Sequence, residues 1–229
     1  DVTIDPPIQE TYNPYADAKD DLERNIDGYC CYCERPATDE AGAVEHIQPK
    51  GLAQYAALEF SWSNFLIACD RCNGADNKSN KDVVFTNIHL PHLNNTIISI
   101  NYKEGGLVQV NNTLTNQELS NATALINLVG LDKRPGHPDH LPKDKRWDRR
   151  REVWEIAKRN LAKYEANSID STTVLDLARG YGFWSIWYNV FINHNDIKQA
   201  LINGFRGTAA CFDADHNPVH RNPGNPDTV

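Results

Sequence analysis

Residues 65–73, FLIACDRCN, join a short apolar run to two cysteines in C-x-x-C spacing, Cys69 and Cys72. Cys30 and Cys33 form a second pair with the same spacing. Each pair can hold one metal ion through two sulfurs, and a tetrahedral Zn²⁺ takes two such pairs. The sequence therefore predicts a four-thiolate zinc site. Such a site is structural, because four thiolates leave no coordination position open.

The other two cysteines, Cys31 and Cys211, are predicted to lie outside the zinc site. Cys31 is an alternative ligand to Cys30, although its spacing to Cys33 is less favourable. Cys211 stands alone in the sequence and is expected in the hydrophobic core. Buried or redox-active thiols are the alternative to zinc. The lack of a secretory signal pattern favours a metal site over disulfides.

Glu45 and His46 stand side by side in VEHIQPKG, residues 44–51, between the two cysteine pairs. The pattern predicts a short strand here that leads into a loop. Asn64 precedes the second cysteine pair, and Asn73 follows it directly. An isolated Glu-His pair usually lies on a surface without a function, so its meaning depends on this surrounding pattern.

Three segments in this order, CCYC at 30–33, VEHIQPKG at 44–51 and SWSNFLIACDRCN at 61–73, resemble the zinc-bearing members of the HNH endonuclease family. The resemblance covers about 50 residues, and the combination is far more specific than any of its parts. It implies an α+β chain that carries a zinc-bearing ββα-metal module. It also implies hydrolysis of nucleic-acid phosphodiester bonds with one catalytic divalent ion, expected to be Mg²⁺.

The resemblance assigns roles to four residues. His46 is the expected general base, which takes a proton from the attacking water. Glu45 and Asn73 are the expected ligands of the catalytic ion. Asn64 is the residue expected to brace the loop that bears the histidine.

One position departs from the family pattern. Many members have a lysine three residues after the last asparagine, where this chain has Asp76. Asp76 and Asn77 are therefore alternatives to Asn73 as the second ligand of the catalytic ion. Lys78 is the nearest lysine, and we expect it and Lys50 to contact substrate phosphates.

A closer similarity links YCCYCERP at 29–36, VEHIQPKG at 44–51 and LINGFRGTAACFDADHNPV at 201–219 to one HNH branch, the PtuB-type endonucleases of Septu and retron-associated antiphage systems. This similarity implies a bacterial cytoplasmic effector nuclease that works with a PtuA-type ABC ATPase. In retron systems a reverse transcriptase and its RNA–DNA product would join the complex. The aromatic C-terminal surface would then dock a partner.

Charge is unevenly distributed along the chain. The formal net charge is -8, yet residues 143–163 contain nine basic and four acidic residues. This window is +5 by count, which leaves -13 for the rest of the chain. A globally acidic protein with one basic helix can still contact phosphates locally. Arg149 and Arg150 in this window are the expected contacts, although such a run more often forms a solvated helix face.

The remaining pattern predicts a zinc-bearing module at 1–95, with a helix at 17–26, and a mostly helical region at 96–229 that begins with a small β-hairpin. The two strands are expected within NTIISINY and GLVQVN. A capping box at Thr115 and Glu118 marks the start of the clearest helix. Further helices and inward-facing positions are expected as follows: Leu119, Ala122, Ile126 and Val129 on one face of the first helix; Trp147, Trp154 and Leu161 on the core side of 145–164; and helices at 170–178, 182–192 and 196–205.

Several functional alternatives fit the same residues. The chain could be an RNase that acts on tRNA, a stand-alone restriction-type enzyme, or a non-catalytic zinc adaptor that joins an ATPase to nucleic acid. Three histidine pairs, 89/92, 137/140 and 216/220, have ligand-like spacing but lie in proline-containing segments, and we do not expect metal there. No apolar run approaches the ~20 residues of a membrane span.

Overall fold

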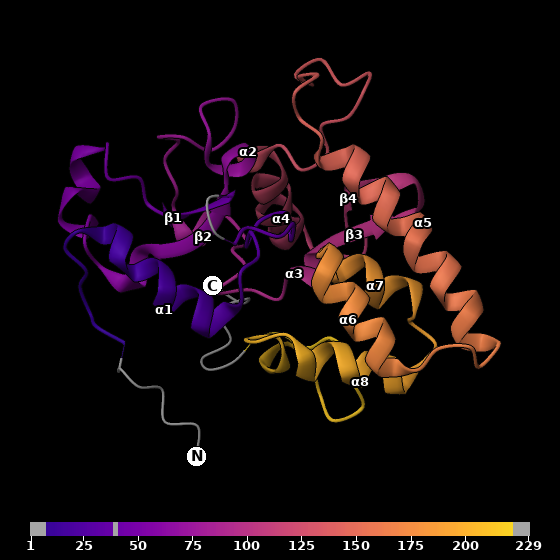
Figure 1. Cartoon of the computed structure of the whole chain (residues 1–229). Helices are drawn as coiled ribbons and strands as arrows, with labels where there is room; N and C mark the ends of the chain where they lie inside the picture. Colours follow the sequence, from indigo (N-terminus) through magenta and orange to yellow (C-terminus); the bar gives the residue numbers. More distant parts are fainter. Residues whose placement is uncertain (1–7, 39–40, 222–229) are drawn as a thin grey trace.

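The computed structural model describes residues 8–38 and 41–221, and the chain is α+β (Figure 1). Two separate two-stranded antiparallel sheets, β1–β2 and β3–β4, lie among the helices. The elements run in the order α1 (Lys19–Ile26), β1 (Gly42–His46), β2 (Phe65–Cys69), α2 (Asp70–Asn73), α3 (Thr96–Ser99), β3 (Ile100–Lys103), β4 (Leu107–Val110), α4 (Asn116–Val129), α5 (Arg146–Glu165), α6 (Ser171–Tyr181), α7 (Trp184–Val190) and α8 (Asn195–Gly204).

The first hairpin carries the residues singled out by the sequence. β1 pairs with β2 so that Glu45 lies opposite Leu66 and His46 opposite Phe65. Every residue of β2 is buried, as its unbroken apolar run predicts. α2 begins at Asp70, directly after the strand, so two strands and a helix follow one another around the cysteines.

The second hairpin is confirmed, but its first strand is shorter than expected. Residues 96–99 form α3 instead, because the side-chain carbonyl of Asn95 accepts a hydrogen bond from Ile97 N at 3.2 Å and starts a helical turn. The capping box of α4 is also present, with Thr115 N donating to Glu118 Oε2 at 3.0 Å. Leu119 was expected in the core and is exposed instead.

Helix α5 faces the core with a different set of residues from the one predicted. Trp147, Trp154 and Leu161 are only half-buried. The buried face lies one position earlier in each repeat and includes two arginines. Because those arginines find backbone and sulfur acceptors inside the protein, their burial is tolerated. The buried residues of α5 are Arg146, Arg150, Val153, Ile156, Ala157 and Asn160.

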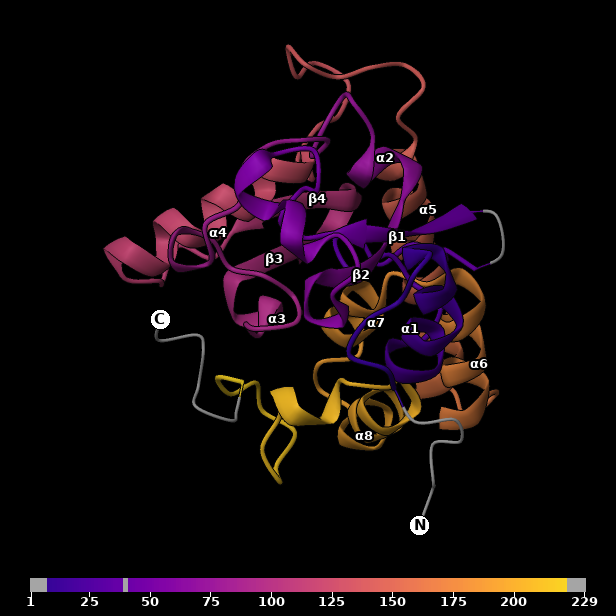
Figure 2. The same ribbon diagram turned by 90° about the vertical axis from the view of Figure 1, so that its left-hand side faces the viewer.

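The zinc-bearing part and the helical part share one hydrophobic core. The carboxylate of Glu34, beside the first cysteine pair, accepts hydrogen bonds from Ser185 N at 2.8 Å and Ser185 Oγ at 2.6 Å at the start of α7. Figure 2 shows α7 between β2 and α8. The sequence boundary at 95/96 therefore marks a change in secondary structure within one packed unit.

The aromatic residues of α7 do not form a docking surface. Trp184, Trp187 and Tyr188 are buried in the shared core, and Phe191 just after the helix is buried with them. This corrects the expectation of an exposed aromatic C-terminal face. Within the described residues, no helix is both long and apolar enough to cross a bilayer.

Candidate functional site

Four cysteines converge as their spacing predicts. The Sγ atoms of Cys30, Cys33, Cys69 and Cys72 all lie within 4.8 Å of one another, and all four residues are buried. The separation between Cys33 Sγ and Cys69 Sγ is 3.7 Å. Zn–S bonds of about 2.3 Å in a tetrahedron place sulfurs about 3.8 Å apart, so the cluster fits a structural Zn²⁺.

Two short backbone features position these thiols. Around the first pair the chain turns tightly, with Glu34 N donating to Cys30 O at 2.8 Å and Cys30 N to Arg35 O at 2.9 Å. The second pair spans the end of β2 and the single turn of α2. Cys31 is outside the cluster, and its backbone N–H donates to Ile67 O at 2.9 Å. The cluster therefore contains Cys30 and not Cys31.

Cys211 is half-buried rather than part of the core. It lies in the 3₁₀ turn Ala209–Cys211, whose residues are not buried. The expectation of a core thiol was therefore wrong. Together with Cys31, it lines a hollow between the segment of the first cysteine pair and the C-terminal segment.

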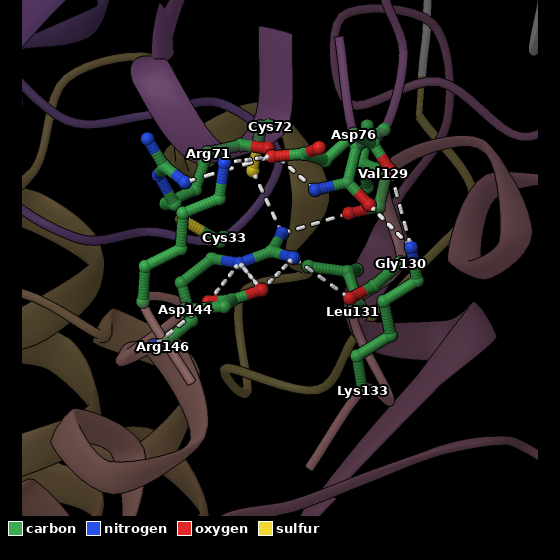
Figure 3. Close-up of polar contacts among 12 residues, drawn as sticks. Cys33, Arg71, Cys72, Asp76, Val129, Gly130, Leu131, Lys133, Asp144 and Arg146 are labelled. Carbon is green, nitrogen blue, oxygen red and sulfur yellow. Dashed lines mark hydrogen bonds and ion pairs between the residues drawn. The ribbon is translucent and has the colours of Figure 1, made fainter. Parts of the chain in front are cut away.

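Arg146 connects the cysteine cluster to the helical part (Figure 3). Its Nη1 donates to Cys72 Sγ at 3.2 Å and to Val129 O at 2.7 Å. Its Nη2 donates to Gly130 O at 2.9 Å and to Asp144 Oδ2 at 2.7 Å, and its Nε donates to Asp144. All five N–H groups of this buried guanidinium thus have partners.

These contacts serve both the metal centre and helix α4. Zn²⁺ with four thiolates carries a net charge of about -2, and a hydrogen-bonded cation stabilises that charge in a dry interior. The carbonyls of Val129 and Gly130 belong to the open C-terminal end of α4, where backbone acceptors lack partners inside the helix. Asp144 balances the arginine charge.

Glu45 is buried and paired with an equally buried lysine. Lys78 Nζ lies 2.5 Å from Glu45 Oε1 and donates to His46 O at 2.7 Å. Burial raises the pKa of Glu45 to about 7, and the opposing effect of the nearby ammonium is smaller. Carboxylate oxygens suit a hard cation, but an ion at Glu45 would have to share or displace Lys78.

His46 is held by an acceptor and by two aromatic rings. Its Nε2 is 2.9 Å from Glu59 O, and a carbonyl only accepts, so Nε2 carries the proton and Nδ1 keeps its lone pair. Tyr15 and Phe65 contact the imidazole edge-on at ring distances of 4.7 and 5.2 Å. Burial lowers the pKa of His46, so the neutral imidazole predominates near pH 7.

Asn64 holds the loop that follows His46. Its Oδ1 accepts from Gln48 N at 2.8 Å, and its Nδ2 donates to Gln48 O at 2.9 Å. Both backbone polar groups of Gln48 are thus bound by one buried amide. The bracing role expected for Asn64 has a direct counterpart in these two hydrogen bonds.

The three candidates for the second ligand of the catalytic ion differ in what they contact. Asn77 is buried, donates to Arg71 O at 2.6 Å and accepts from Lys133 Nζ at 2.9 Å. Asp76 is exposed and pairs with Lys143 Nζ at 2.7 Å. Among the described residues, the side-chain amide of half-buried Asn73 makes no hydrogen bond. Asn73 is therefore the candidate whose side-chain oxygen is not already engaged in a hydrogen bond or ion pair and could bind a metal ion.

Two of the four predicted phosphate contacts are inaccessible. Lys78 is buried against Glu45, and buried Arg150 donates to Gly106 O at 3.0 Å and Leu131 O at 2.7 Å. Both predictions were wrong, because a residue pattern does not show which cations find acceptors in the core. Lys50 lies at the surface, paired with Glu59 Oε1 at 2.9 Å, and Arg149 is also exposed.

Sequence reasoning missed Arg146 and the acceptor carbonyl of Glu59. Arg146 lies in a run of surface-like charges, and only the nearby Asp144 hints at a pair. Within residues 8–38 and 41–221, the four cysteines are the one group of three or more His, Cys, Asp or Glu residues that could hold a metal ion.

No protein-family model matches the chain, and no curated protein matches it.

Proposed function

We propose that this protein is a metal-dependent endonuclease of the HNH type, in which β1, β2 and α2 form the ββα-metal module around a structural zinc. The observation that carries the proposal is the loop after β1. There the Glu45–His46 pair lies at the end of β1. In the loop that follows, the side-chain amide of Asn64 binds both the backbone N–H and the backbone carbonyl of Gln48. The hydrogen bonds of His46 and Asn64 support the roles proposed for these two residues, whereas Glu45 would have to share or displace Lys78 to bind an ion.

His46 acts as the general base. Glu59 O fixes the tautomer, so the lone pair of Nδ1 is available to take a proton from water. The edge-on contacts with Tyr15 and Phe65 restrict rotation of the ring. Asn64 positions the histidine loop, and Lys78 ties His46 O to the segment after α2. These contacts fix the direction from which the histidine meets a substrate.

Glu45 and Asn73 are the residues that would hold the catalytic ion. A Mg²⁺ bound there would stabilise negative charge that develops at the scissile phosphate. The carboxylate and amide oxygens match the ligand preference of this ion, which commonly binds one or two protein ligands and completes its shell with water and phosphate. DNA and RNA are both candidate substrates, because the phosphodiester bond on which these residues would act is common to both.

The proposal extends to the biological setting implied by the sequence resemblance. There the protein is the effector nuclease of a bacterial cytoplasmic antiphage complex, with a PtuA-type ATPase as partner and, in a retron system, a reverse transcriptase with its RNA–DNA product. The support for these partners is the similarity of residues 29–36, 44–51 and 201–219.

Replacement of His46 tests the enzymatic proposal. The zinc-loaded chain is incubated with Mg²⁺ and labelled plasmid DNA, single-stranded DNA and tRNA, with and without the candidate ATPase. We expect His46→Ala to reduce cleavage by at least about 100-fold, the usual contribution of a general base. His137→Ala, which replaces a half-buried histidine in the loop between α4 and α5 that has no role in the proposed site, is the matched control and should cleave like the wild type.

One observation favours a second candidate, a non-catalytic zinc adaptor. The Glu45 carboxylate is already neutralised by Lys78, so the pair can serve stability without any catalytic ion. A folded, zinc-loaded chain that cleaves none of these substrates under any of these conditions would support the adaptor and contradict the nuclease.

A further inference from the structure

A hollow of about 530 Å³ lies between the cysteine-bearing part of the chain and helices α5 and α6. Arg35 and Arg71 reach it from either side of the cysteine cluster, and Lys145 and Arg149 reach it from the start of α5. Lys143 comes from the loop before that helix. Figures 1 and 2 both show α2 and the start of α5 at the same end of the molecule.

The lining has more positive than negative charge, in contrast to the chain as a whole. Five solvent-reaching cations face two lining carboxylates, Asp70 and Glu152, whereas the net charge of the whole chain is -8. The charge of buried Arg146, at the base of the hollow, is balanced by Asp144. Asp76 and Asp148 pair with two of the lysines at the edge, so they moderate the excess.

The arrangement of these cations suits an extended polyanion. They come from three separate parts of the chain, at Arg35, at Arg71 and within residues 143–149, and each pairs with one or two carboxylates at or near the surface. Surface ion pairs of this kind contribute little stability, so a phosphate can replace the carboxylate at small cost. Arg149 shows this clearly, because its side chain is 67% exposed and contacts Glu152 Oε2 at 2.7 Å.

An aromatic ring lies on the same lining. Tyr181, the last residue of α6, is 43% exposed and is one of the few large apolar side chains at the surface of the described residues. Exposed aromatic rings beside cationic grooves stack on unpaired bases, whereas bases inside a duplex have no free face.

We propose that this hollow, lined by Arg35, Arg71, Lys143, Lys145, Arg149 and Tyr181, binds the phosphodiester backbone of a single-stranded nucleic acid. The inference rests on the proposed nuclease function and names the substrate class for it. Arg71 lies in α2, the helix that ends at Asn73, so a strand in the hollow runs past the helix that carries a proposed ligand of the catalytic ion.

Binding is measured by fluorescence anisotropy with the zinc-loaded chain in buffer without Mg²⁺, using labelled 20-residue single-stranded DNA, single-stranded RNA and duplex DNA. We expect either single strand to bind more tightly than the duplex. Arg149→Glu should weaken binding about tenfold and reduce the slope of log affinity against log salt concentration by about 0.7. Tyr181→Ala should weaken binding about fivefold or more.

Two further variants separate local from general effects. Arg159→Glu changes the charge equally on the same helix, at an exposed position outside the hollow, and should stay within about twofold of wild type. Glu152→Gln removes the carboxylate beside Arg149 and should tighten binding, a gain that a folding defect cannot produce. Equal losses for Arg149→Glu and Arg159→Glu, preference for the duplex, or no binding to any probe would overturn the proposal.

Cleavage assays on the same variants keep the two proposals distinguishable. If Arg149→Glu and Glu152→Gln shift binding as expected but the wild type cleaves nothing, then single-stranded nucleic acid binds in the hollow and the proposed nuclease function is wrong. If wild type cleaves, His46→Ala does not, and Arg149→Glu binds and cleaves like Arg159→Glu, the nuclease function stands and the hollow is wrong.

Discussion

Loss of the zinc ion is expected to abolish the cooperative fold. The cysteine cluster joins the segment after α1 to β2 and α2, and through Arg146 it joins α4 and α5. Structural zinc contributes about 10–16 kcal/mol in small zinc-binding peptides, which is comparable to the roughly 5–15 kcal/mol that stabilises a typical domain. Without the ion, four buried thiols have no common partner to hold them together, and Arg146 faces neutral thiols in place of a negatively charged metal centre.

Cys72→Ser provides the direct test, with zinc content measured by mass spectrometry and unfolding followed by circular dichroism. We expect less than one zinc per chain and no cooperative thermal transition. Cys31→Ser, next to a ligand but outside the cluster, should retain one zinc and the wild-type transition. Wild-type zinc content in Cys72→Ser, or an unchanged transition in the zinc-free wild type, would rule out this account of the metal centre.

Arg146→Ala is expected to cost about 3–5 kcal/mol of unfolding free energy, the usual effect of removing one partner from a buried ion pair. The substitution leaves buried Asp144 without its cation and Cys72 Sγ and two backbone carbonyls without their donor. In a chain of this size, each kcal/mol lowers the melting temperature by roughly 2–4 °C, so the transition should fall by about 10 °C.

The matched control lies on the same helix. Arg149 is exposed and makes one ion pair with Glu152, so Arg149→Ala should cost less than about 1 kcal/mol. Both variants are measured zinc-loaded by urea unfolding. Arg146→Lys keeps the charge without the forked donor geometry and should fall between them. Similar losses for Arg146→Ala and Arg149→Ala would show that the contacts in Figure 3 do not stabilise the fold.

The cysteine cluster could be predicted from sequence because a metal imposes its own geometry. Two C-x-x-C pairs have few other uses in one chain, and their convergence does not depend on the surrounding fold. The first hairpin as a whole was expected only from the family resemblance. Local pattern alone predicted a short strand within residues 44–51, and β1, which ends at His46, confirms that strand.

The sequence could not show which charged side chains are buried, because their burial depends on contacts with residues distant in sequence. Lys78 is buried because Glu45, on another element, is buried beside it. Arg150 is buried whereas its neighbour Arg149 is exposed, because only Arg150 donates to the carbonyls of Gly106 and Leu131. The helix repeat of α5 identified an apolar stripe, but tertiary acceptors moved the buried face by one residue.

The central claim, that Glu45 and Asn73 hold a catalytic ion beside His46, is tested most directly by counting bound Mn²⁺. Electron paramagnetic resonance is recorded on the zinc-loaded His46→Ala chain, for which we expect cleavage at least about 100-fold slower, with a single-stranded oligonucleotide present. The account predicts one tightly bound Mn²⁺ per chain, and its loss when Asn73→Ala is added. No tightly bound Mn²⁺, or one that persists unchanged without the Asn73 amide, would contradict it.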